Sequence, residues 1–222
     1  MKVKAKSNFE DPPIGTHLAR CIGLIGIGTH KSSYMGEERY RDEIVIMWEL
    51  PHEFRADGKP FSVYQNYTRS LGKKANLRHH LVAWRGRDFT KEELEEFELK
   101  NILDKGCQVV LTQNEKGYIN VTSVAGLPKG TQLPDRVHDL VYCDVYEFDE
   151  AEFERLSTYY QEKITSSYEY REQRDFGRVL SDIERIKVDR EGPQALGESA
   201  GNGTAIAAAM APVRPEDDDI PF

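Results

Sequence analysis

The sequence predicts a mainly β fold with appended helices, and two observations lead to this prediction. β-prone stretches bounded by turn residues recur along residues 16–148, as is typical of antiparallel strands joined by turns. Hydrophobic residues change to a spacing of three and four over residues 77–84 and again over 153–164, which indicates helices with one apolar face. We therefore expect two groups of strands, a helical insertion between them, and further helices after the last strand.

The first predicted strand, residues 16–27, is long and contains several glycines. Gly23, Gly26 and Gly28 are suited to β-bulges, which allow one strand to bend sharply and to serve two sheets. The other predicted strands span residues 42–50, 61–68, 107–112, 118–124 and 140–148. Three strands, a helical insertion and two more strands is the order of an OB barrel. The sequence thus predicts an OB-fold barrel with a helical insertion between strands 3 and 4.

The helical insertion is predicted from Leu77, Leu81 and Trp84, which recur at four and three residues and form one helical face. Trp84 is therefore expected mainly in the core. Thr90 followed by Glu93 is a capping-box signal, and it predicts the start of a second, acidic helix.

The predicted organisation has five parts. They are an N-terminal arm at residues 1–15, the barrel at 16–148, a helical extension at 149–190, a disordered linker rich in Gly, Ala and Pro at 191–214, and an acidic tip at 215–222. The three cysteines are scattered and show no Cys-x-x-Cys spacing, which is typical of reduced thiols in a cytoplasm. The sequence also shows no membrane-spanning run and no signal-peptide pattern, so a cytoplasmic location is expected.

The charge of the chain is distributed unevenly. The net charge is −8, which on its own argues against binding to a nucleic acid. Residues 1–90, however, hold 15 Lys+Arg and 10 Asp+Glu, whereas residues 91–222 hold 15 and 28. A basic front half and an acidic rear half are expected when one part meets polyanions and another meets basic partners. Ordinary segregation of surface charge is the alternative explanation.

Cationic and aromatic side chains gather in the first half of the chain. Non-specific binding of a single strand requires cations for the phosphates and exposed aromatic rings on which bases stack. Within residues 61–68, alternation places Tyr64 on a polar face, whereas Tyr67 shares the apolar face and is either core or stacking platform. Trp48 shares an apolar face of its own strand and is expected mainly in the core. The candidate strand-binding residues are Lys31, Tyr34, Arg39, Tyr40, Arg41, Lys59, Tyr64, Tyr67, Arg69, Lys73, Lys74 and Arg78.

The sequence ends on an acidic segment with an apolar tip, Pro-Glu-Asp-Asp-Asp-Ile-Pro-Phe. Burying unpaired carboxylates in its own core would cost several kcal/mol for each ion, so this segment is expected in solvent. A solubilising tail would not require the apolar tip, which suits a pocket in a basic partner surface. The candidate partner-binding residues are Asp217, Asp218, Asp219, Ile220, Pro221 and Phe222.

The segment DDDIPF resembles the C-terminal tip of bacterial single-stranded-DNA-binding proteins. Residues 67–99 are in addition similar to phage-encoded single-stranded-DNA-binding proteins of the OB class. These resemblances imply non-enzymatic, sequence-independent binding of single-stranded DNA in phage replication, recombination or repair, in the cytoplasm of the host. They also imply that the tip recruits replication, recombination and repair enzymes. The longer helical insertion and the C-terminal helices depart from the bacterial proteins, so the oligomeric state, including a homo-oligomer, stays open.

Three alternatives compete with this interpretation. In a metal-dependent nuclease, Asp42, Glu43 and Glu49 would be metal ligands with the adjacent His79 and His80. These residues lack ligand spacing, and adjacent side chains on a helix point in different directions, so we expect no catalytic residue, no metal and no cofactor. An adaptor that acts through its tail alone would not bind strands. An RNA-binding or strand-annealing protein would use the same stacking and phosphate contacts.

Overall fold

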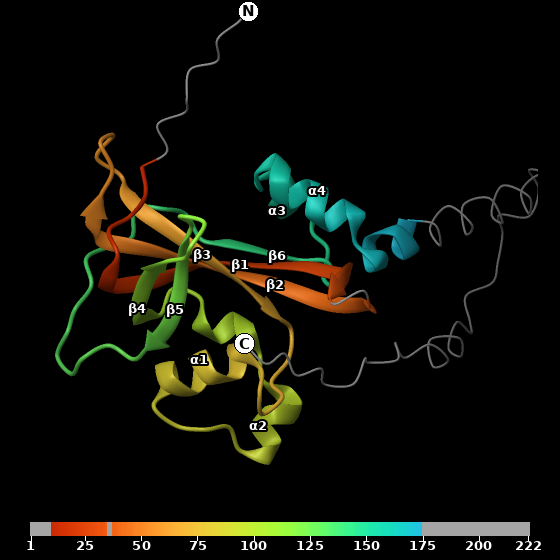
Figure 1. The fold of residues 1–222 in the computed structure, drawn as a ribbon, viewed down its shortest axis with the longest axis horizontal. Coiled ribbons are helices and arrows are strands. Elements are labelled where there is room, and N and C mark those ends of the chain that lie inside the picture. The colour runs from red at the N-terminus through yellow and green to blue at the C-terminus, as the bar shows by residue number, and fades with distance from the viewer. Residues whose placement is uncertain (1–9, 35–36, 175–222) are drawn as a thin grey trace, which may run out of the picture.

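The computed structural model describes residues 10–34 and 37–174 (Figure 1). Most of the predicted N-terminal arm lies outside the described residues. The same holds for the end of the helical extension, the predicted linker at 191–214 and the acidic tip at 215–222. These predictions stay predictions.

The described residues form a six-stranded sheet, which confirms the mainly β prediction. The strands are β1 (Gly15–Tyr34), β2 (Glu37–Phe54), β3 (Pro60–Thr68), β4 (Gly106–Gln113), β5 (Ile119–Ala125) and β6 (Val141–Asp144). Their order is β3-β2-β1-β4-β5, with antiparallel pairing throughout, and β6 pairs with β1 in parallel (Figure 1). β3 and β5 lie in contact, but within the described residues no ladder joins them, so the sheet is not closed.

β1 pairs with three other strands, and its glycines allow it to bend between them. It pairs with β4 over residues 15–20 and with β6 over residues 23–26, while it pairs with β2 along most of its length. The register with β2 shifts between Cys21 and Gly23 and again between Gly26 and Gly28. Gly28 has a φ of +78°, which is in the left-handed region that favours glycine. The predicted bulges are therefore confirmed.

The β1–β2 hairpin is longer than the sequence predicted. Residues 29–34 pair with residues 37–42, although the predicted strands ended at residue 27 and began again at residue 42. This stretch carries charged and polar side chains on both of its faces, so it lacks the apolar alternation by which a half-buried strand is recognised. The predicted strand at 140–148 is shorter in the structure, because β6 ends at Asp144 and a turn follows.

The helices lie on the two sides of the sheet. α1 (Asn76–Arg85), α2 (Lys91–Glu96) and the 3-10 helix η1 (Leu99–Ile102) form the predicted insertion between β3 and β4. The predicted capping box is confirmed at the start of α2. α3 (Glu150–Glu154) and α4 (Thr158–Ser166) follow β6 and lie on the other side (Figure 1). Among the described residues, no helix has the length and apolar character needed to cross a membrane.

Two hydrophobic clusters lie on opposite faces of the sheet within the described residues. The larger cluster contains Trp48, fully buried as predicted, together with Leu77 and Leu81 of α1. Trp84 packs against this cluster and donates its indole N–H to the Gly106 carbonyl at 2.8 Å. The second cluster joins the outer face of β1 and β2 to the C-terminal helices, and its buried members are Ile25, Ile27, Val45, Cys143, Val145, Leu156, Ile164 and Tyr170. The C-terminal helices therefore belong to the folded body.

Candidate nucleic-acid interface

β3 separates its residues between a buried and an exposed face. Phe61, Val63 and Tyr67 are buried, whereas Ser62, Tyr64, Asn66 and Thr68 are exposed. The pleat of a strand sends alternate side chains to opposite faces, so this pattern follows from the sequence. Tyr64 is 59% exposed although it carries a large ring, which makes that ring accessible to a ligand.

Tyr67 is not accessible in the same way, and its prediction as a strand-binding residue is wrong. It is 4% exposed, and its hydroxyl lies 2.7 Å from Nδ1 of His80 in α1. The two rings also meet edge to face, with their centroids 5.5 Å apart. Burial raises the pKa of the Tyr67 hydroxyl, so the group stays neutral in the core. Of the two roles the sequence left open, Tyr67 has the core role.

The exposed face of β3 continues into α4 through aromatic contacts. The ring of Tyr64 lies 6.5 Å from that of Tyr160, at 88°, and Tyr160 lies 5.2 Å from Tyr159, at 70°. We call Tyr64, Tyr160 and Tyr159 the tyrosine row. Tyr159 is 56% exposed, and Nζ of Lys163 lies 5.9 Å from its ring centroid. The sequence placed Tyr160 on an apolar helical face, but it gave no signal that Tyr159 would extend the exposed face of β3.

The hairpin beyond the body of the sheet brings several predicted cations together. We call residues 30–34 and 37–41 the hairpin ribbon. Lys31 lies opposite Tyr40, and Ser32 lies opposite Arg39, while Arg41 follows on the same strand. Tyr40 is 55% exposed. The cations have carboxylates beside them, since Lys31 forms an ion pair with Glu38 and Arg39 with Glu37. The side chain of Tyr34 lies outside the described part of the hairpin.

The segment after α4 connects the tyrosine row to the hairpin ribbon. Tyr168 is 57% exposed, and the next residue, Glu169, accepts hydrogen bonds from the backbone N–H and the hydroxyl of Thr29 beside the hairpin ribbon. The pKa of the Tyr168 hydroxyl is raised, mainly by its hydrogen bond to Glu172, and Tyr40 contributes to the shift. Exposed tyrosines are therefore found at both ends of α4.

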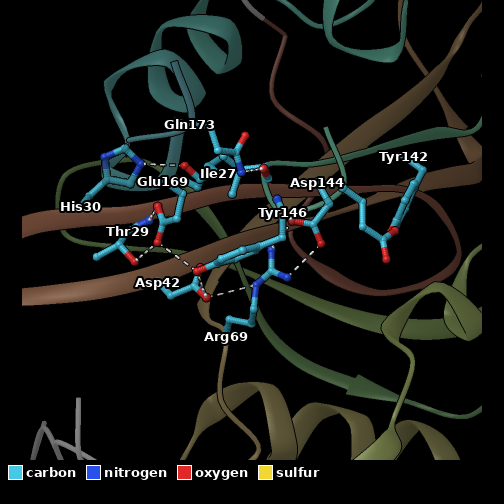
Figure 2. A network of polar contacts seen from close by, with 12 residues as sticks. Ile27, Thr29, His30, Asp42, Arg69, Tyr142, Asp144, Tyr146, Glu169 and Gln173 are labelled. Carbon is cyan, nitrogen blue, oxygen red and sulfur yellow. Dashed lines mark hydrogen bonds and ion pairs between the residues drawn. The ribbon is translucent and has the colours of Figure 1, made fainter. Parts of the chain in front are cut away.

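A polar network lies where the hairpin ribbon joins the sheet (Figure 2). We call it the root network, and it consists of Thr29, Asp42, Arg69, Asp144, Tyr146 and Glu169. It connects β1, β2, the end of β3, β6 and the segment after α4. Thr29 and Glu169, which are 140 residues apart in the sequence, form hydrogen bonds here. The network therefore holds the segment after α4 to the hairpin.

Arg69 is the centre of the root network, and its guanidinium group is already paired. It donates two hydrogen bonds to the Asp144 carboxylate, at 2.9 and 2.7 Å, and its Nε lies 3.3 Å from an oxygen of Asp42. It also lies over the ring of Tyr146, at 4.8 Å from the centroid. A Cβ at Gly26 would collide with both Arg69 and Asp144, so only glycine at this position allows the pair to lie across β1. The prediction that Arg69 contacts a phosphate stays a prediction, and that contact would have to compete with two carboxylates.

The environment of the root network changes the protonation of its acids. Burial raises the pKa of Asp42 to about 6, although Arg69 and the Tyr146 hydroxyl partly oppose the shift. Burial also disfavours the charge of Glu169, but hydrogen bonds from the Thr29 hydroxyl and backbone N–H outweigh it and lower the pKa. The Tyr146 hydroxyl lies 3.1 Å from Asp42 and 2.9 Å from Glu169, and its single proton is donated to one of them at a time. The two carboxylates thus compete for one donor.

The remaining predicted cations lie in three different settings. Arg78 is 13% exposed at its side chain and donates hydrogen bonds to Asp88, the shortest at 2.9 Å, and to the Leu71 carbonyl. It therefore fixes the β3–α1 connection, and a phosphate would have to displace Asp88. Lys73 and Lys74 are exposed on the same connection. Lys59 lies in the β2–β3 turn, at the end of β2 opposite the hairpin ribbon, so the structure does not bring it together with Lys31 or Tyr40 (Figure 1).

Two of the acids considered as metal ligands, Asp42 and Glu49, have other partners. Glu49 is fully buried and accepts backbone N–H groups of Val137 and His138, at 3.1 and 2.8 Å, while Nδ1 of His138 lies 2.6 Å away. It thereby holds the segment before β6 across the outer face of β2. Within residues 10–34 and 37–174, no group of His, Cys, Asp and Glu side chains is arranged to hold a metal ion.

The candidate interface therefore consists of the exposed face of β3, the tyrosine row and the hairpin ribbon, with Lys73 and Lys74 at the end of β3. Arg69, Arg78 and Tyr67 lie close to it but serve the folded body through the contacts described above. Compared with known proteins, the chain matches no family model, and no curated protein shows significant sequence similarity to it.

Proposed function

We propose that this chain binds single-stranded DNA without sequence preference, through an OB-type barrel, and that it is not an enzyme. The strand order supports the proposed barrel, because β3-β2-β1-β4-β5 is the circular order of an OB fold opened between β3 and β5. OB folds are partly open barrels, and β3 and β5 lie in contact here. α1 connects β3 to the strands after the insertion and packs against β3 and β5, as a helix at the end of such a barrel does.

The exposed ring of Tyr64 is the observation that carries the proposed function. The faces of strands 2 and 3 and the adjoining loops are where OB folds bind oligonucleotides. Tyr64 lies on that face among Ser62, Asn66 and Thr68, and its ring stays 59% exposed beside its edge-to-face neighbour Tyr160. Stacking of a base on such a ring contributes about 1–3 kcal/mol and tolerates every base. This explains binding without sequence preference.

The hairpin ribbon supplies cations for the phosphates. Lys31 and Arg39 form ion pairs with Glu38 and Glu37, and these carboxylates are 63% and 73% exposed at their side chains. Ion pairs in solvent contribute about 0–1 kcal/mol, so a phosphate can replace the carboxylate at small cost. Lys73 and Lys74 extend the positive charge beyond the end of β3.

The biological role follows from the sequence rather than from the described residues. We propose that the chain covers exposed strands during phage DNA replication, recombination or repair. The acidic segment with Asp217, Asp218, Asp219, Ile220, Pro221 and Phe222 would recruit a partner enzyme. Without a bound strand, the same segment would lie over the basic groove of its own barrel, since its charge imitates that of a strand.

A fluorescence titration of the full chain tests this function. Labelled single-stranded DNA, duplex DNA and single-stranded RNA of equal length are compared at low salt and then at increasing salt. We expect the tightest binding to single-stranded DNA, with a log–log salt slope of about −0.7 for each phosphate neutralised. Absence of binding to oligo-dT at low salt, both with residues 215–222 and after their removal, would contradict the proposal. Tighter binding to RNA would favour the RNA-binding alternative.

A further inference from the structure

The tyrosine row crosses from the barrel onto the C-terminal helices. Tyr64 belongs to β3, whereas Tyr160 and Tyr159 belong to α4, and the rings contact each other in that order. α4 packs on the sheet through Ile164 and the partly buried Tyr160, so its position relative to Tyr64 is fixed by the second hydrophobic cluster. The row is therefore a built feature of the folded body.

Tyr159 is not required by the packing of α4. The ring is 56% exposed, and among the described residues it contacts the edge of Tyr160 and the Lys163 ammonium group. Single exposed apolar side chains are normal on a protein surface, but neighbouring rings in a contiguous series mark a binding surface. Edge-to-face packing also leaves ring faces uncovered, and a base needs an uncovered face to stack.

We infer that α4 forms a second part of the strand-binding surface, in which Tyr159 stacks on a base and Lys163 contacts a phosphate of the strand that crosses Tyr64. This inference rests on the proposed function and extends it from the barrel to the C-terminal helices. The ligand class is a single-stranded nucleic acid, because Tyr159 presents a ring and Lys163 presents a cation within 5.9 Å of it. The surface of α4 then offers a ring on which a base can stack and a cation that can contact the phosphate of the same strand.

The same arrangement predicts the path of a longer strand. α4 spans nine residues, about 13 Å at the rise of an α-helix. Beyond its end, Glu169 accepts hydrogen bonds from the backbone N–H and the hydroxyl of Thr29, the residue next to the hairpin ribbon. A strand that leaves Tyr64 along α4 therefore arrives at Lys31 and Arg39. The C-terminal helices thus join the two parts of the candidate interface.

The test compares two variants of Tyr159 in the full chain. Tyr159→Ala removes the ring, while Tyr159→Phe keeps it and removes only the hydroxyl. We expect Tyr159→Ala to weaken binding of oligo-dT of about 20 nucleotides about tenfold, and Tyr159→Phe to leave it unchanged. For oligo-dT of about 4 nucleotides, at the lower end of what one OB fold covers, both variants should bind like the unmodified chain. Circular dichroism and thermal unfolding should show the same stability for all three proteins.

A second readout makes contact at α4 directly visible. Ultraviolet cross-linking of the unmodified chain to oligonucleotides that carry 5-iodouracil, followed by peptide mass spectrometry, should identify Tyr159 together with Tyr64. If the long oligonucleotide binds all variants of Tyr159 equally and no cross-link forms at α4, the inference is overturned while the proposed function stands. If the unmodified chain binds no oligonucleotide, the proposed function itself fails. A change in self-association on sedimentation, with strand binding intact, would instead assign the row to protein contacts and overturn the inference.

Discussion

The root network and the hairpin ribbon both place cations beside carboxylates, yet the two regions use the same chemistry differently. In the root network, Arg69 is 30% exposed and makes two hydrogen bonds to Asp144, which is 15% exposed. In the hairpin ribbon, Lys31 is 52% exposed and its partner Glu38 is 63% exposed. Pairs removed from water hold a structure together, whereas solvated pairs exchange partners easily. A cation near a proposed binding face is therefore available to a phosphate only where its existing partner is in solvent.

The largest expected effect is the loss of stability when Arg69 is removed. Removing one partner of a buried ion pair leaves the other charge uncompensated, at a cost of about 3–5 kcal/mol, and the partial exposure of Arg69 reduces this to about 2 kcal/mol. Denaturant unfolding of Arg69→Ala measures this loss. Arg155→Ala is the matched control, because Arg155 is 45% exposed at its side chain and pairs with Glu152 on the surface. It should change the free energy of unfolding by less than about 0.5 kcal/mol. Equal free energies of unfolding for the two variants would contradict the claim that the ion pairs of the root network stabilise the fold more than solvated pairs do.

The hairpin ribbon should show the opposite behaviour. The double variant Lys31→Gln with Arg41→Gln removes two cations without uncovering a buried partner, so the free energy of unfolding should stay within about 0.5 kcal/mol. The affinity for oligo-dT at low salt should fall, and the log–log salt slope should become flatter by about 1.4, or about 0.7 for each phosphate that is no longer neutralised. Fluorescence anisotropy over a range of salt measures both quantities. An unchanged slope would exclude the ribbon from the interface.

A smaller effect concerns the pH dependence of stability. The pKa of Asp42 is raised by burial from 3.8 to about 6, so the folded protein binds this proton more readily than the unfolded chain does. Its contribution to stability is fully present below 3.8 and is lost as the pH rises through about 6. Relative to Asp42→Asn, the unmodified chain should therefore gain stability as the pH falls from neutral to about 4. Unfolding of both proteins in urea at several pH values measures the difference. A constant difference would show that the folded environment does not disfavour the charge of Asp42, because Arg69 and Tyr146 would then balance the effects of burial, Asp144 and Glu169.

The sequence predicted those features that depend on local pattern. The alternation of β3 separated Tyr64 from the core, the glycines of β1 predicted its bulges, and Thr90 with Glu93 predicted the start of α2. Each of these depends on neighbouring residues, and a single sequence contains that information. The order of strands and helices along the chain followed from the same patterns.

The features that the sequence did not predict depend on long-range contacts. The partner of Arg69 lies 75 residues further along the chain, and the partner of Thr29 lies 140 residues further. Tyr159 falls outside the apolar stripe of its helix, so its pattern is that of any solvent-facing residue. For Tyr67, alternation placed the residue on the apolar face of its strand but could not show that its hydroxyl would pair with His80 of α1. The sequence indicated the kinds of residue at the candidate interface, but it could not show which of these residues have partners inside the folded body.

The most direct test of the proposed interface is a pair of substitutions at Tyr64. The ring is exposed on the polar face of β3, so Tyr64→Phe should keep the stability of the unmodified chain. Tyr64→Ala should still fold, with a loss of about 0.5–1.5 kcal/mol because it removes the edge-to-face contact with Tyr160. Titration with labelled oligo-dT measures the affinity of all three proteins. We expect Tyr64→Phe to bind like the unmodified chain and Tyr64→Ala to bind about tenfold more weakly, with an unchanged salt slope, because the substitution removes a stacking ring and no cation. Equal affinity of the two variants would contradict the claim that bases stack on this face.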